Sequence, residues 1–246
     1  MTDSSHNYQL VLGYDGSGFA GSQRQGDRRT VQLELERAWQ AATGECVTAT
    51  LAGRTDAGVH AEGQVASVRS SRVLAPWDLK AELASSLPGD VALKSVSVAE
   101  PDFDARRSAR WRRYEYVLPL HAERGFGSSY LDEDCMRLAL TQLLGERDFT
   151  ALASSSELGP RGARRRLLHA SVGAWSGSAT VFAVVADAFL RQMVRRIVSA
   201  VVAVGSGRLG MLELRRAVEM RSRHLLPGPA PARYLTLAAV GYGEYR

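Results

Sequence analysis

The sequence predicts an α+β protein built from two similar halves, and three observations support this fold class. Apolar residues alternate with polar ones in several short segments, as in strands, and recur every three or four positions in others, as in helices. In residues 1–104 these segments follow the order βαββαβ. From Trp111 onward the same order returns with one added helix. We therefore expect a first half at 1–104 and a second half at 105–246, joined in one largely antiparallel sheet with helices on one side.

The first half is predicted to begin with a strand at 8–14, whose residues are apolar and aromatic with partial alternation. Thr30 can cap a helix that runs to about residue 43, because its side chain can accept a hydrogen bond from the first turn. Pro76 opens a second helix, since its fixed φ suits the first helical position. Three further strands are expected at 47–52, 64–69 and 91–98. This order is the ferredoxin-like pattern, which is also that of RRM-like domains.

The second half is predicted from the same kinds of pattern. Its longest helix begins at Phe189, and apolar residues recur at helical spacing as far as Val202, which gives one continuous core-facing stripe. The remaining expected elements are strands at 111–118, 167–175, 179–186 and 234–242 and helices at 131–144 and 211–221.

The composition is that of a soluble globular protein, with 45% hydrophobic and 23% charged residues in 246. It contains no apolar run of about 18 residues, so we expect no membrane-spanning helix. The first residues do not follow the basic-then-apolar pattern of a signal peptide. The two cysteines, Cys46 and Cys135, form no CxxC motif, which argues against a disulfide scaffold and a zinc site. We expect a cytoplasmic protein without a metal.

The net charge of +5 and the isoelectric point near 9.5 favour a polyanionic partner. All but two of the 31 basic residues are arginine, the exceptions being Lys80 and Lys94. Arginine suits bidentate contacts with phosphate and stacking on bases. A GC-rich genome would also raise the arginine content, so the clustering of arginines is more informative than their number.

Residues 53–61 are the most unusual stretch, because Gly53 and Gly58 bracket Arg54 and Asp56 between two predicted strands. Glycine permits a sharp turn or the close approach of a ligand. Arginine offers a flat, permanently charged group, and the aspartate offers a carboxylate. An ordinary β-turn would also explain Asp-Ala-Gly.

Basic residues gather with aromatic ones just before the strand at 111–118. Five arginines lie within 106–113 around Trp111, and Arg112 and Arg113 directly precede Tyr114. RNA-binding proteins use this combination, since phosphates attract charge and unstacked bases pack on flat side chains. A second basic run lies at 161–166. A solvated linker and a solvated loop remain open as alternatives for these two segments.

Arg195 lies beside the apolar stripe of the longest helix, so its guanidinium group is expected near buried surface. A buried guanidinium group needs a carboxylate. We therefore expect Arg195 to pair with a carboxylate.

The stretch Gly-Arg-Thr-Asp-Ala-Gly-Val-His-Ala at 53–61 resembles the signature loop of the tRNA pseudouridine synthase A family, and weaker matches extend from about residue 8 to the C-terminus. The resemblance implies that Asp56 is the catalytic aspartate and that Arg54 takes the space vacated by a flipped nucleotide. Tyr114 would then lie beneath the target uracil, Arg195 would pair with Asp56, and Leu235 would occupy an apolar position of the active site.

The glycine-rich segment at 15–26 fits GxGxxG but lacks the Gly-Lys-Ser/Thr ending of a P-loop, and no clear helix opens on it. The family resemblance implies that this segment contacts RNA, with Gln23 and Gln25 as polar contacts. A flexible connection would equally explain its glycines.

The chain departs from the family pattern at a few positions. Ser22 stands where an aromatic residue is usual, Arg196 and Ser199 stand where Asn and Gly are common, and Tyr234 stands where Gly is usual.

The resemblance implies an isomerase that converts uridine to pseudouridine at positions 38, 39 and 40 of the tRNA anticodon stem-loop. This reaction breaks the N-glycosidic bond, rotates the uracil and rejoins it through C5, so no cofactor is expected. The family also implies a homodimer in which one tRNA touches both subunits. An RNA-binding cleft would form where the two halves meet.

Two other functions are compatible with the residues alone. A non-catalytic RNA-binding module with two RRM-like halves would not need Asp56, and the chain lacks the RNP1 pattern. A hydrolase with an aspartate nucleophile would need a second carboxylate, for which Glu62 is the nearby candidate.

Overall fold

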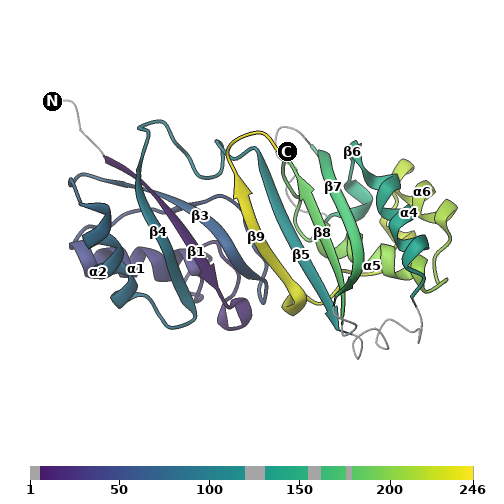
Figure 1. The fold of residues 1–246 in the computed structure, drawn as a ribbon, viewed down its shortest axis with the longest axis horizontal. Coiled ribbons are helices and arrows are strands. Elements are labelled where there is room, and N and C mark those ends of the chain that lie inside the picture. The colour runs from purple at the N-terminus through teal and green to yellow at the C-terminus, as the bar shows by residue number, and fades with distance from the viewer. Residues whose placement is uncertain (1–5, 120–130, 155–161, 176–178, 246) are drawn as a thin grey trace. The chain divides into compact units, whose positions relative to one another are not determined.

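The computed structural model describes residues 6–119, 131–154, 162–175 and 179–245 (Figure 1). The chain divides into two compact units, one of residues 1–110 with 236–244 and one of residues 111–235 with 245–246. All of the last strand except its first residue, Leu235, thus belongs to the unit that contains residues 1–110, whereas the sequence places everything after residue 104 in the second half.

The strands of the first unit pair in the order β4-β1-β3-β9. They are β1 (His6–Tyr14), β3 (His60–Ser70), β4 (Val91–Ala99) and β9 (Leu235–Gly241), and the short β2 (Thr50–Leu51) pairs with β3. β1 pairs antiparallel with both neighbours, so that Leu10 lies opposite Ala66 of β3 and Val96 of β4. β9 runs parallel to β3, with Thr236 opposite His60.

Two helices form the core of this unit together with the sheet (Figure 1). In α1 (Val31–Thr43), Thr30 accepts a hydrogen bond from the Leu33 nitrogen at 3.3 Å, and Gly44 ends the helix in the left-handed region at φ 75°. α2 (Pro76–Ser86) has proline at its start, as predicted. The ring of Trp39 on α1 is fully buried and lies 5.8 Å from the ring of Tyr8 on β1.

The second unit has the strand order β5-β8-β7-β6, and neighbouring strands in this order pair antiparallel. The strands are β5 (Trp111–Pro119), β6 (Gly145–Asp148), β7 (Arg164–Trp175) and β8 (Ala179–Ala186). The helices are α4 (Glu133–Leu143), α5 (Met193–Gly205) and α6 (Met211–Glu219), and short 3₁₀ turns include η4 (Arg223–Leu225) and η5 (Ala232–Tyr234). Most of α5 is buried, including Ile197 and Val201, as its apolar stripe predicts.

The predicted α+β class is confirmed, and so is most of the predicted order of elements. The prediction was wrong in three places. The helix expected from Phe189 begins at Met193, because Gln192 has φ 62° and cannot be helical. The strand expected at 47–52 is reduced to β2, and the short polar strand β6 was not predicted. The joining of the two halves in one sheet stays a prediction.

None of the described helices is long and apolar enough to cross a membrane. The described residues also contain no group of three histidine, cysteine, aspartate or glutamate side chains that could hold a metal ion.

Candidate active site

The Asp56 loop, residues 53–59, connects β2 to β3 in the first unit. The side chain of Arg54 is exposed, Thr55 is buried, and Asp56 is half-buried. The backbone turns after Asp56, whose carbonyl oxygen accepts a hydrogen bond from the Val59 nitrogen at 3.1 Å. The loop therefore presents a cation and a carboxylate on either side of a buried anchor.

The anchor, Thr55, is held by two residues far from it in the sequence. Its backbone nitrogen donates to Oγ of Ser22 at 2.8 Å, and its carbonyl oxygen accepts from the Ser22 nitrogen at 3.0 Å. Its Oγ1 lies 2.9 Å from the hydroxyl oxygen of Tyr14, and all three residues are buried. Buried hydrogen bonds of this kind fix both the position and the orientation of the backbone that carries Asp56.

Gln64 of β3 holds the beginning of the same loop. Its side chain is fully buried; Nε2 donates to the carbonyl oxygen of Gly53 at 2.8 Å, and Oε1 accepts from the Gly53 nitrogen at 3.2 Å. Nε2 also lies 3.3 Å from the Tyr14 hydroxyl oxygen. Burial raises the pKa of Tyr14, so its hydroxyl stays protonated and remains a hydrogen-bond donor at neutral pH.

The glycine-rich segment at 15–26 packs closely against the Asp56 loop. A Cβ atom at Gly16 would lie 2.0 Å from the Val59 carbonyl oxygen, and one at Gly21, which has φ 102°, would lie 2.9 Å from the Thr55 carbonyl oxygen. These glycines therefore permit close backbone contact, which a merely flexible connection would not require. Gln23 is half-buried and Gln25 is exposed, with its side-chain nitrogen 3.4 Å from the Ala20 carbonyl oxygen.

His60, at the other end of the loop, is attached to the same segment. Its Nδ1 lies 3.2 Å from the Gly16 nitrogen and 3.1 Å from Oδ1 of Asp15. The pKa of Asp15 is lowered, chiefly by hydrogen bonds from Ser17 and also by His60. These contacts give His60 a structural part in holding the loop.

Arg106 is a cation near the Asp56 loop that the sequence did not single out within its cluster. Much of its side chain is exposed, yet its pKa is lowered, first by loss of hydration and then by the charge of Arg54. The two guanidinium groups are therefore close enough to repel each other. Together they make one side of the loop attractive to an anion.

In the second unit, β5 carries the predicted aromatic residues on its buried face. Its residues alternate between half-buried and buried, so that Tyr114 and Tyr116 share a face, as predicted. The Tyr114 ring packs edge-on against Phe189, with ring centroids 5.1 Å apart and an angle of 87° between the planes. The Tyr116 ring packs edge-on against Phe182 at 6.5 Å and Tyr234 at 6.0 Å.

The hydroxyl of Tyr116 is buried and has no hydrogen-bond partner within the described part of the chain. Its pKa is raised by burial, and the nearby Arg195 acts in the opposite direction. Arg195 therefore lies within electrostatic reach of this aromatic group. Burying a hydroxyl without a hydrogen-bond partner costs free energy of folding.

Arg195 lies in the first turn of α5. Its Nε donates to the carbonyl oxygen of Ala230 at 2.6 Å, and its own carbonyl oxygen accepts from the Ala230 nitrogen at 3.1 Å. Because η5 follows shortly after Ala230, these bonds fix the segment that leads to the buried Leu235. Tyr116, Tyr234 and Arg195 are thus brought together.

Arg112 and Arg113 lie on opposite faces of β5. Arg112 is buried on the face of Tyr114, and its Nη1 donates to the Asp187 carbonyl oxygen at 2.9 Å. Nη2 of Arg113 lies 2.7 Å from Oε1 of Glu115. One arginine of the pair therefore supports the loop after β8, and the other lies nearer the surface.

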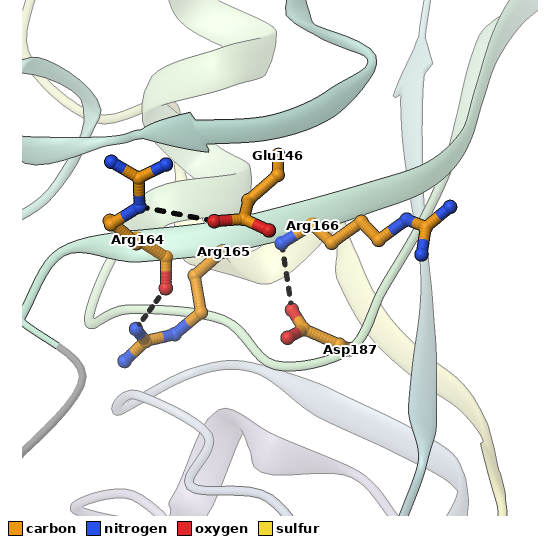
Figure 2. Close-up of a pocket in the computed structure, with 5 residues that line it drawn as sticks. All are labelled: Glu146, Arg164, Arg165, Arg166 and Asp187. Atoms are coloured by element: carbon orange, nitrogen blue, oxygen red, sulfur yellow. Dashed lines mark hydrogen bonds and ion pairs between the residues drawn. The ribbon is translucent and has the colours of Figure 1, made fainter.

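Three arginines of the basic run at 161–166 line a pocket of about 300 Å³ at the edge of β6 and β7, which is formed by Glu146, Arg164, Arg165, Arg166 and Asp187 (Figure 2). Nε of Arg164 lies 3.1 Å from Oε1 of Glu146, and Arg165 turns back to the Arg164 carbonyl oxygen at 2.6 Å. The Arg166 nitrogen donates to Oδ1 of Asp187 at 2.9 Å, while its guanidinium group points away from the other four side chains (Figure 2). Internal pairing thus neutralises part of this run; Arg161 lies outside the described residues.

The predicted site residues fall into two groups. Asp56 and Arg54 lie in the first unit, whereas Tyr114, Arg195 and most of the aromatic cluster lie in the second. The convergence of Asp56 with Tyr114, Arg195 and Leu235 stays a prediction. The sequence missed Ser22 and Gln64 as supports of the Asp56 loop. Gln64 left a signal, a polar residue at the start of an alternating strand, but Ser22 left none.

Comparison with known proteins identifies relatives over nearly the whole chain. A family model described as tRNA pseudouridine synthase matches residues 11–106 and 139–243. The tRNA pseudouridine synthase A of Chloroflexus aurantiacus (strain ATCC 29366 / DSM 635 / J-10-fl) is 41% identical, with 95% of this chain and 87% of the relative covered. The protein of the same name from Methylacidiphilum infernorum is 38% identical, covering 96% and 95%, and that from Klebsiella pneumoniae (strain 342) is 37% identical, covering 96% and 90%.

Proposed function

The chain belongs to the tRNA pseudouridine synthase A family, and from this premise we propose that it acts on uridines 38, 39 and 40 of the tRNA anticodon stem-loop. As a member of that family it is an isomerase that makes pseudouridine in tRNA, which removes the hydrolase and the non-catalytic RNA-binding module as alternatives. The observation that carries the proposal is that buried hydrogen bonds hold the Asp56 loop in place. Ser22 and Tyr14 make these bonds with Thr55.

In this proposal Asp56 is the catalytic carboxylate. The reaction exchanges an N-glycosidic bond for a bond to C5 of the uracil, so it needs one ionised carboxylate as nucleophile or base. Arg195 pairs with Asp56 and keeps it ionised, because a nearby cation favours the charged form. Since atoms are only rearranged and no electrons are transferred, the enzyme requires no cofactor.

The remaining residues hold the flipped nucleotide. Removing a base from its stack costs a few kcal/mol, which packing in the pocket offsets. Tyr114 lies beneath the uracil, Leu235 provides apolar contact, and Arg54 fills the space that the nucleotide leaves. Gln23, Gln25, Arg112 and Arg113 are the proposed further RNA contacts.

Tritium release from tRNA labelled at C5 of uridine tests this function directly. We expect release from an anticodon stem-loop with uridine at position 38, 39 or 40, and none when all three uridines are replaced by cytidine. Free uracil in place of pseudouridine would indicate hydrolysis and contradict the proposal. Release that persists after the three replacements would reject the assigned positions alone.

We further propose that the enzyme is a cytoplasmic homodimer in which one subunit holds the target nucleotide and the other grips the tRNA body. A tRNA is much longer than a subunit of this length, whose radius of gyration is about 18 Å. Both described cysteines are free thiols, as is usual in a reducing compartment.

Light scattering should give a dimer. Mixing Asp56→Asn subunits with subunits that carry Arg164→Glu and Arg166→Glu should restore activity that neither parent shows. A monomer, or no restoration in verified mixed dimers, would reject the shared-substrate arrangement.

A further inference from the structure

Arg196, near the beginning of α5, has two other arginines as electrostatic neighbours. Arg195 and Arg196 are in the first turn of α5, and Arg223 opens η4. The pKa of Arg196 is lowered by burial and then by the charges of Arg223 and Arg195, so each of these two guanidinium groups is within repulsive reach of Arg196. We call Arg195, Arg196 and Arg223 the α5 arginine cluster.

Arg196 and Arg223 lack a counter-charge within the described part of the chain. Neither side chain makes an ion pair or hydrogen bond there, and Nε of each is buried without a hydrogen-bond partner. Other arginines contact carboxylates: the partly exposed Arg29 contacts Asp90 at 2.7 Å, and the exposed Arg215 contacts Glu219 at 2.7 Å. A half-buried pair of arginines that repel each other while leaving donors unused is unfavourable unless an anion joins them.

The backbone is strained at two residues that lie close in sequence to members of the α5 arginine cluster. Among the described residues other than glycine, only Gln192 (φ 62°) and Arg221 (φ 55°) have a left-handed backbone. Gln192 directly precedes α5, and Arg221 lies two residues before Arg223. Such strain persists where the surrounding structure imposes it and is found most often at functional sites.

The beginning of α5 adds to the positive field. This helix has 13 residues, no acidic residue in its first turn, and no side-chain cap from Gln192. A helix carries partial positive charge at its N-terminus, where an anion is favoured. The arginine side chains and the N-terminus of α5 therefore both favour the binding of an anion.

We propose that Arg196 and Arg223 together bind a phosphate group of the RNA backbone, next to the target uridine. This inference rests on the proposed function, because Arg195, the neighbour of Arg196, is the proposed partner of Asp56. A phosphate between the two guanidinium groups accepts charge-assisted hydrogen bonds from both and removes their mutual repulsion. Its negative charge also draws the flanking nucleotide toward the second unit.

Binding of a tRNA anticodon stem-loop, measured over a range of salt concentrations, tests the proposal with Arg196→Gln, Arg223→Gln and the double variant. Each single variant should bind about tenfold more weakly and lower the slope of log affinity against log salt by about one. The double variant should be little weaker than either single one, because both arginines hold the same phosphate. Arg215→Gln, which removes an exposed, paired arginine, is the matched control and should leave affinity and slope unchanged.

Thermal unfolding without RNA separates an anion site from a structural role. Removing one of two repelling cations should leave the melting temperature unchanged or raise it, and inorganic phosphate should stabilise the unchanged protein more than the variants. Variants that bind the stem-loop with unchanged affinity and salt slope would overturn the proposal, even if they lost the effect of phosphate. A protein that shows the expected binding pattern but releases no tritium would retain this site and lose the proposed reaction.

Discussion

Ser22 holds Thr55, the residue before Asp56, through two hydrogen bonds of 2.8 and 3.0 Å. Thirty-three positions separate the two residues in the chain, and both are buried. Ser22 thus acts on Asp56 through the backbone of the Asp56 loop. A carboxylate that must meet a reacting atom needs such support, because small displacements of a catalytic group are costly.

Ser22→Ala is expected to lower kcat at least about tenfold while changing KM little, because the Thr55 nitrogen loses its acceptor and the Asp56 loop shifts. Leaving that buried nitrogen without a partner should also destabilise the protein by about 1–3 kcal/mol. Steady-state kinetics and thermal unfolding measure the two effects. Ser95→Ala, at an exposed position of β4, is the control. Unchanged kcat in Ser22→Ala would show that Ser22 does not position Asp56.

Asp56→Asn should abolish turnover and leave tRNA affinity within about tenfold, which corresponds to roughly 1.4 kcal/mol. The substitution keeps the size of the side chain and removes the ionisable group. Tritium release and filter binding report the two quantities, and Asp78→Asn on the exposed face of α2 is the matched control. More than a trace of pseudouridine from pure Asp56→Asn would remove Asp56 from its catalytic role.

Arg195→Met should also abolish activity, since the proposed cationic partner of Asp56 is lost while most of the apolar stem remains. The variant gives up the 2.6 Å bond to Ala230 as well, so its fold must be checked by thermal unfolding. Arg208→Met, at an exposed position after α5, serves for comparison. An active, folded Arg195→Met protein would indicate that another arginine pairs with Asp56.

Tyr114→Phe should retain most activity, because the ring that packs on Phe189 stays in place, whereas Tyr114→Leu should lose at least about tenfold through lost stacking on the uracil. Tyr116→Phe is the control on the same face of β5. It removes a buried hydroxyl that has no hydrogen-bond partner in the described chain, so stability should be unchanged or higher by about 1 kcal/mol. Turnover and melting temperature are the measurements. A large defect in Tyr114→Phe would instead assign its hydroxyl to proton transfer.

Asp90 should contribute a pH-dependent part of stability through its two hydrogen bonds from Arg29, at 2.7 and 2.8 Å. Arg29 holds the pKa of Asp90 below its ordinary value of 3.8. The contribution is therefore complete well above 3.8 and is lost as the pH falls through the lower pKa of the folded state. Because the pair is partly exposed, Asp90→Asn should cost about 1 kcal/mol near neutral pH.

The measurement for Asp90 is the difference in melting temperature between the unchanged protein and Asp90→Asn. This difference should shrink as the pH is lowered from neutral toward about 3. A constant difference across that range would show that the ion pair is not its origin.

Features of this protein that depend on neighbouring residues could be predicted from the sequence. Thr30 caps α1 as predicted, because such a cap needs only the side chain of one residue and the backbone nitrogen of another three positions away. Alternation in β5 placed Tyr114 and Tyr116 on one buried face, and helical spacing identified the buried stripe of α5. The catalytic role proposed for the Asp56 loop also comes from the sequence, since the residues that carry the family resemblance are contiguous.

Only the tertiary structure decided the features that join distant parts of the chain. Ser22 meets Thr55, and Gln64 meets Gly53, because packing brings together backbone atoms that no local pattern relates. α5 begins at Met193 and not at Phe189 because Gln192 adopts a left-handed conformation, which the preference of a residue other than glycine does not predict. The repulsion of Arg223 on Arg196 has the same origin: electrostatic interaction depends on distance through space, and the fold alone sets that distance.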